Sequence, residues 1–195
     1  MNTGCVNMAV DKISDSLVEM ALECGAKGAQ YLPGSAVITD PVFRRICEGN
    51  ACGMFGKCYM CPPDIGPLEE LTAQIHRFPH AVLYQSIGTL EDSFDFEGMM
   101  EAGHTHCMLS QRIRKNLEGK LPGHLHLTGG GCHLCVRCAK LDDQPCRHPE
   151  EALSSLEGYG IDVYRTSQAT DLKYINGENT VTYFGIILFS ETDSL

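Results

Sequence analysis

Four cysteines in the second half of the chain have the spacing of ligands to an inorganic cofactor. Cys132, Cys135 and Cys138 form a C-x2-C-x2-C run, and Cys146 follows after seven intervening residues. Three thiolates spaced in this way can surround a compact object, and a more distant fourth can close its far side. This spacing favours a [4Fe–4S] cluster, in which each iron takes one thiolate. Zinc is the alternative, although a zinc ribbon uses two C-x2-C pairs and would leave one cysteine of this run unused.

The residues around this run suit a negatively charged cofactor. Three glycines at 129–131 let the backbone come close, and their N–H groups can donate to cluster sulfurs. Arg137, Lys140 and Arg147 place positive charge beside four thiolates, whose cluster is net negative. We therefore expect the loop 129–149 to hold a [4Fe–4S] cluster.

A second group of four cysteines lies within fifteen residues of the loop 47–63: Cys47, Cys52, Cys58 and Cys61. Gly53 and Gly56 interrupt any regular element there, and an irregular loop of this length usually needs a reason to be ordered. Metal binding supplies that reason.

The spacing of this upstream group, C-x4-C-x5-C-x2-C, is less diagnostic and leaves several kinds of site open. It suits a second iron–sulfur cluster or a zinc ion with four thiolates. It also suits a site in which only Cys47, Cys52 and Cys61 bind and the fourth position is open. Cys61-Pro62 resembles the Cys-Pro that ends bacterial ferredoxin motifs, where that cysteine binds the other cluster. Exchange of ligands between the two groups therefore stays open.

Other histidines and cysteines have simpler interpretations. His104 and Cys107 are three residues apart and share a helix face, and His124 and His126 share one side of a strand. Either pair has the residue types of a metal site, but no third ligand is evident nearby. We interpret the histidines as hydrogen-bonded or solvated and Cys107 as a buried thiol.

Cysteine content predicts the compartment. The chain has eleven cysteines, and its start, MNTGCVNMAVDKIS, has neither the basic end nor the apolar core of a signal peptide. Many cysteines without an export signal indicate metal ligation and not disulfides. We therefore expect a cytoplasmic protein in a reducing, oxygen-poor setting, as in an anaerobe.

The charge and the hydropathy argue against two classes of partner. Fifteen Lys and Arg against 25 Asp and Glu give a formal net charge of −10, which would repel nucleic-acid phosphates and anionic lipids. No apolar run reaches the roughly 18 residues that a membrane span needs. We expect no nucleic-acid partner and no membrane association.

Length and periodicity predict the architecture. An apolar content of 43% over 195 residues suits a single α/β domain over 1–195, with a mixed β-sheet flanked by helices and two cysteine-rich metal-binding loops. Strands are expected at 35–39, 81–87, 123–128, 160–164 and 180–189. Helices are expected at 11–24, from 67 to before 79, from a cap at Asp92 or Ser93 to 117, and from 149 to 157. The last strand is almost continuously apolar, so it should be central or covered on both faces.

Taken together, the two cysteine groups make the chain resemble the DUF2284 family of predicted metal-binding proteins. The resemblance rests on the pattern around Cys47, Cys52-Gly53, Gly56-Lys57 and Cys61-Pro62-Pro63, on Gly131-Cys132 to His148-Pro149, and on Tyr159 to Val163. It implies that Cys132, Cys135, Cys138 and Cys146 bind in one site and that Cys47, Cys52 and Cys61 belong to the other. It gives Cys58 no place, so Cys58 is assigned to the upstream group by proximity alone.

Three functions are compatible with these sites. The first is a redox module that passes single electrons to a partner protein. The second is an accessory enzyme that acts on a small molecule or cofactor through a cluster iron without a protein thiolate. The third is a structural zinc protein. No nucleophile–base pair stands out, so whether the protein is an enzyme stays open and no catalytic residue is assigned.

Overall fold

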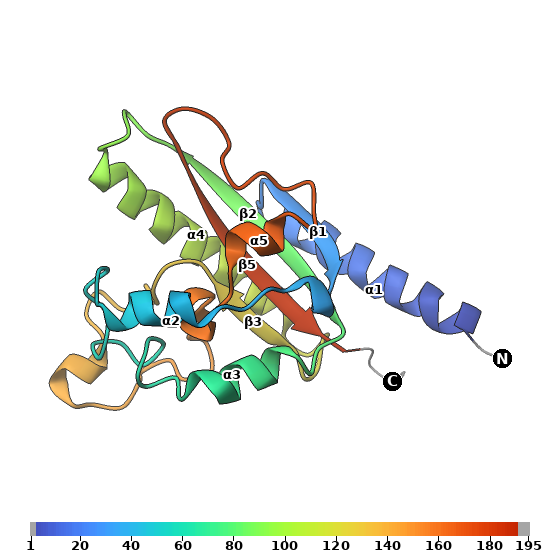
Figure 1. Ribbon diagram of the computed structural model, residues 1–195, viewed down its shortest axis with the longest axis horizontal. Helices are drawn as coiled ribbons and strands as arrows, with labels where there is room; N and C mark the ends of the chain where they lie inside the picture. The colour runs from blue at the N-terminus through green and yellow to red at the C-terminus, as the bar shows by residue number, and fades with distance from the viewer. Residues whose placement is uncertain (1–2, 191–195) are drawn as a thin grey trace.

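The apolar segment TVTYFGIILF forms the central strand of the sheet. The computed structural model describes residues 3–190 and has strands in the order β1-β2-β5-β3-β4 (Figure 1). Their bounds are Gly28–Pro33 for β1, His80–Thr89 for β2, Leu125–Thr128 for β3, Ser154–Ser155 for β4 and Thr180–Phe189 for β5. β5 pairs antiparallel with β2 and β3, whereas β3 and β4 are parallel. The predicted mixed sheet and the central place of the last strand are confirmed.

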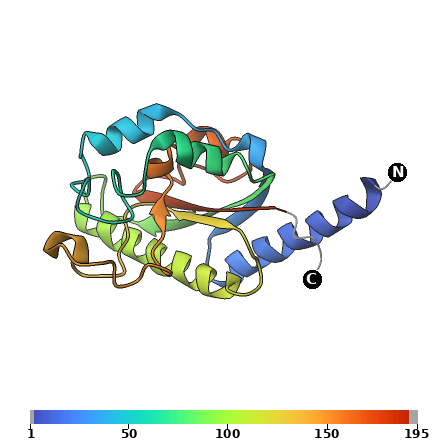
Figure 2. The same ribbon diagram turned by 90° about the horizontal axis from the view of Figure 1, so that it is seen from below.

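Helices cover both faces of this sheet (Figure 2). One face carries α1 (Thr3–Glu23) and α4 (Phe96–Leu117). The other carries α3 (Leu68–Ile75) and the 3-10 helix η3 (Glu157–Tyr159), with α2 (Pro41–Glu48) and α5 (Val163–Ser167) alongside. Within β5, Ile186 and Leu188 pack into the α3 layer, and Ile187 and Phe189 pack into the α1–α4 layer. Within residues 3–190, no helix has the length and apolar character of a membrane span.

Two of the expected strands, at 35–39 and 160–164, are wrong. In each segment a short turn or helix takes the place of the strand. At 35–39, Gly34–Ala36 forms a 3-10 turn, η1, because the chain folds closely over Phe78. A Cβ on Gly34 would lie 1.9 Å from the Phe78 carbonyl oxygen, so glycine is required there. At 160–164, the side chain of Asp162 accepts from the Arg165 N–H and starts α5. What remains is one antiparallel bridge between Thr39 and Ile161.

Helix boundaries follow the capping side chains. Helix α4 begins later than expected because Asp95, and not Asp92 or Ser93, caps it: its Oδ1 accepts from the Gly98 N–H at 2.8 Å. The helix expected at 149–157 is wrong. Its second half instead forms β4 and η3, since Ser154 pairs with Leu127 at the sheet edge.

A buried polar network lies between α4 and the sheet. It joins Tyr84, Ser86, His106, Ser110, His126 and Thr128. The Tyr84 hydroxyl lies 2.8 Å from both Ser110 Oγ and His126 Nε2, and Ser86 Oγ lies 2.8 Å from His106 Nδ1. Burial lowers the pKa of His106 to about 4 and that of His126 to about 3. Both rings are therefore neutral at pH 7, as the hydrogen-bonded interpretation of His126 predicts.

These two histidines predict that acid destabilises the fold. In the unfolded chain their pKa is near 6.5, so between pH 7 and pH 5 the unfolded state takes up protons that the folded state does not. Stability should fall by about 2 kcal/mol for each histidine over that interval. The variant His126→Gln keeps a polar group beside Tyr84 but does not titrate. Urea unfolding at both pH values should therefore show a loss smaller by about 2 kcal/mol in His126→Gln.

The matched control is His76→Gln, at an exposed histidine, which should follow the parent protein. A His126→Gln variant with the parent's pH dependence would contradict the assignment of a neutral, buried His126.

Candidate metal centre

The upstream cysteines are carried by the end of α2 and by the turns that follow it. Asp40 caps α2, with its Oδ1 accepting from the Val42 N–H at 2.8 Å, and the last turn of the helix presents Cys47. Asn50 Oδ1 then accepts from the Phe55 N–H, and the Gly56 N–H donates to the Pro62 carbonyl. Gly56 has φ of +67°, a conformation that glycine adopts readily. The expected irregular loop is therefore present and held by its own backbone.

The downstream cysteines follow β3 directly. Gly129 lies against β5 so closely that a Cβ there would be 2.8 Å from the Phe184 carbonyl oxygen. The His133 N–H then donates to the buried thiol of Cys107 on α4, and burial raises the pKa of that thiol. Cys107 thus anchors the loop to the helix, which agrees with its interpretation as a buried thiol.

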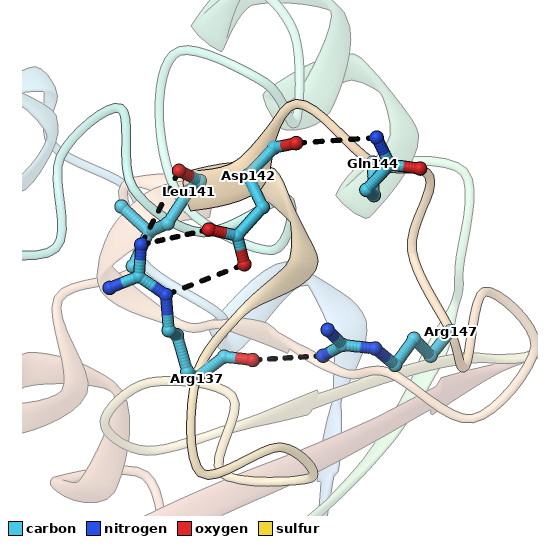
Figure 3. Close-up of polar contacts among 5 residues, drawn as sticks. All are labelled: Arg137, Leu141, Asp142, Gln144 and Arg147. Atoms are coloured by element: carbon cyan, nitrogen blue, oxygen red, sulfur yellow. Dashed lines mark hydrogen bonds and ion pairs between the residues drawn. The ribbon is translucent and has the colours of Figure 1, made fainter.

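Ion pairs and backbone contacts shape the rest of the downstream loop (Figure 3). Arg137 forms an ion pair with Asp142 at 3.0 Å, and Arg147 Nη1 donates to the Arg137 carbonyl at 2.9 Å. Between them, Cys138 precedes the 3-10 helix η2, Ala139–Asp142. These contacts hold the segment 137–147 in a closed turn. Cys138 and Cys146, which lie near its two ends, therefore line the same cavity.

The two loops meet around a cavity of about 640 Å³. Six cysteines line it: Cys52, Cys58, Cys132, Cys135, Cys138 and Cys146. Tyr183 of β5 and Met100 and Gly103 of α4 line the same space. Lys57, Arg137 and Arg147 add positive charge to it, although the chain as a whole is acidic. The cavity therefore combines thiols with a positive surrounding, which suits a cofactor that carries negative charge.

A smaller cavity of about 240 Å³ lies beside the first. It is lined by Cys47, Cys52 and Cys61, together with the partly buried Glu157 at the start of η3. Burial raises the pKa of Glu157, and the pKa of the Cys47 thiol is raised by burial and by the negative charge of Glu157. Glu157 was not predicted as a site residue, since its sequence position carries no ligand spacing.

Thiol–thiol hydrogen bonds connect the two groups. Cys58 is only 2% exposed, and its sulfur hydrogen-bonds with those of Cys132, Cys61 and Cys138. These hydrogen bonds lower the pKa of Cys58, and the same bonds raise the pKa of Cys61 and of Cys132. The three thiols therefore titrate as one coupled group that spans the two loops.

Three side chains hold the upstream loop against the downstream loop. The Tyr59 hydroxyl donates to the Gln144 carbonyl at 2.9 Å. Lys140 forms an ion pair with Asp64, and its ammonium lies 5.2 Å from the centre of the Tyr59 ring. We call Tyr59, Asp64 and Lys140 the latch.

Of the remaining cysteines and histidines, His133 and His148 line the larger cavity, whereas Cys24, Cys107 and His104 line neither cavity. Cys24 directly follows α1 and receives a hydrogen bond from Asn116. Cys5 lies outside the residues whose side chains are described. The His104 ring lies edge-on to the His133 ring, with 6.2 Å between the ring centres. Over residues 3–190, no three His, Cys, Asp or Glu side chains converge as a group able to hold a single metal ion.

The fold and the thiol-lined cavities define a cysteine-rich α/β protein with candidate metal sites at one end of its sheet. Comparison with known families then places it: residues 30–189 match the family described as predicted metal-binding protein, DUF2284, and the chain belongs to that family. The expected resemblance is thereby confirmed. Neither the curated proteins nor the solved structures give a match.

Loss of the latch should weaken the hold on metal without unfolding the protein. Lys140→Met removes both the ion pair with Asp64 and the contact with the Tyr59 ring. The two loops should then separate more readily, so metal should pass to a chelator several-fold faster than from the parent protein. Lys173→Met, at an exposed lysine far along the chain, is the control. Equal release rates in the two variants would show that the latch does not hold the site closed.

Proposed function

We propose that the protein is an iron–sulfur protein that holds a [4Fe–4S] cluster in the larger cavity and passes single electrons to a partner protein. The observation that carries this proposal is the lining of that cavity, where six thiols from two loops surround one space. Thiols spread around a cavity suit a cofactor with several metal atoms, because each iron takes its own thiolate. When bound, such a cluster would supply a reversible one-electron couple.

The surrounding residues support this role. Lys57, Arg137 and Arg147 would balance the negative charge of a thiolate-bound cluster. Tyr183 and Met100 would shield the side of the cofactor that faces the sheet. On the outside, Val136 is fully exposed and lies on the wall of the same cavity. An electron would therefore have a short route from the cavity to the surface, and the acidic chain would favour a basic redox partner.

Metal content tests this proposal directly. Protein purified without oxygen should be brown and carry about four iron and four sulfide per filled cluster site. Reduction should give an EPR signal that disappears on reoxidation. Zinc without sulfide would favour a structural zinc protein instead. A colourless, metal-free and folded sample would contradict both interpretations.

The smaller cavity supports a second candidate function, an accessory enzyme that acts on a small molecule. Three thiols and one carboxylate, from Glu157, line this space. A cluster bound there through Cys47, Cys52 and Cys61 would have one iron without a protein thiolate. Such an iron can act as a Lewis acid. Glu157 lies on the same wall, where its carboxylate can compete for that iron or position a bound molecule.

Cyanide is a suitable probe of an iron without a protein thiolate. If the smaller cavity holds such an iron, added cyanide should change the EPR spectrum of the reduced protein. Glu157→Gln should alter this response because a neutral amide competes less well for iron than a carboxylate does. Glu178→Gln, at an exposed position outside the cavity, should leave it unchanged. If cyanide leaves the EPR spectrum of the parent protein and of both variants unchanged, this second function is contradicted.

A further inference from the structure

Cys58 and Cys61 stand on opposite sides of one tight turn. The Cys61 N–H donates to the Cys58 carbonyl at 3.1 Å, and the Gly56 N–H closes the same segment on the Pro62 carbonyl at 2.9 Å. Cys58 lines the larger cavity, and Cys61 lines the smaller one. The turn is therefore part of the wall between the two cavities.

The segment around Cys58 faces the downstream loop throughout. Lys57, Cys58, Tyr59 and Met60 all line the larger cavity. The Cys58 sulfur hydrogen-bonds with Cys61 of its own turn and with Cys132 and Cys138, the first and last cysteines of the C-x2-C-x2-C run. The next residue, Tyr59, donates to the Gln144 carbonyl of the same loop as that run. Two of the three thiol partners of Cys58, and the contact of the adjacent side chain, therefore lie in the downstream loop.

We propose that Cys58 is a ligand of the same cofactor as Cys132 and Cys138, so that the two cysteine groups interleave. This inference rests on the proposed metal cofactor in the larger cavity. A run of three cysteines completed by one distant cysteine is a known way of binding a cluster, and because each iron takes one thiolate, Cys58 would take the place expected for Cys146. The smaller cavity then keeps Cys47, Cys52 and Cys61, and the four cysteines of loop 47–63 serve two sites.

Variants that empty the smaller cavity first give a clean test. In Cys47→Ala/Cys61→Ala protein, prepared without oxygen, the smaller cavity lacks two of its three thiols and the larger cavity should keep its cofactor. Adding Cys58→Ala to this background should lower iron and sulfide as far as adding Cys132→Ala does. Adding Cys58→Ser should retain more iron than Cys58→Ala and shift the EPR spectrum, since a serine oxygen can replace a thiolate on iron. Adding Cys24→Ser, at a cysteine that directly follows α1 and lines neither cavity, should leave iron, sulfide and the EPR spectrum unchanged.

The outcomes separate this inference from the proposed function. If Cys58→Ala leaves iron, sulfide and EPR spectrum as in the background, Cys58 is not a ligand and the inference is overturned. If the background holds zinc without sulfide and Cys58→Ala releases that zinc, the interleaving stands and the iron–sulfur function fails. If the background holds no metal, both fail. Far-UV circular dichroism of each variant guards against misfolding, and the Cys58→Ser spectrum decides the matter if Cys58→Ala does not fold.

Discussion

The position of both cysteine loops depends on the register between β2 and β5. Gly185 pairs with Tyr84, and a Cβ at Gly185 would lie 2.1 Å from the Tyr84 ring. A slip of one residue would place Phe184 or Ile186 under that ring and exchange the two faces of the strand. With the register fixed, Tyr183 reaches Met99 on α4, where its hydroxyl donates to the carbonyl at 2.9 Å. The wall of the larger cavity is thus set by the core of the sheet.

A buried arginine fixes the segments that surround the smaller cavity. Arg44 of α2 is 7% exposed and donates to the carbonyls of Gly66 and Gly158 at 2.9 and 3.0 Å. It joins the helix that carries Cys47 to the end of the upstream loop and to the residue after Glu157. Removing a buried charge from its hydrogen bonds is costly, so these three segments stay together. Its ion pair with Glu48 at 3.6 Å has the i,i+4 spacing of a helix, but the two contacts that join the segments are to backbone carbonyls, which no sequence pattern marks.

Patterns in the sequence predicted correctly those features of the fold that depend on interactions between residues near one another in the chain. The burial of β5 on both faces followed from its apolar run, and the irregular loops followed from their glycines and cysteines. The strands expected at 35–39 and 160–164 failed because a β-branched run shows only that extended backbone is favoured, and here that tendency yields one bridge between Thr39 and Ile161. The residues that line the two cavities were harder to predict than the strands. Spacing groups cysteines along the chain, whereas Cys58 and Glu157 are placed by a turn and by the return of the chain after β4, which spacing does not encode.

The hydrogen bonds among Cys58, Cys61 and Cys132 also connect the two cavities energetically. Cys58 hydrogen-bonds with a thiol on each side, so the turn between Cys58 and Cys61 is held by both groups at once. A metal bound in either cavity would displace thiol protons and so remove one of these hydrogen bonds. Because both cavities share this turn and also share Cys52, a cofactor in one would change the wall of the other. If both cavities bind metal, their occupancies should therefore be coupled through the segment that separates them.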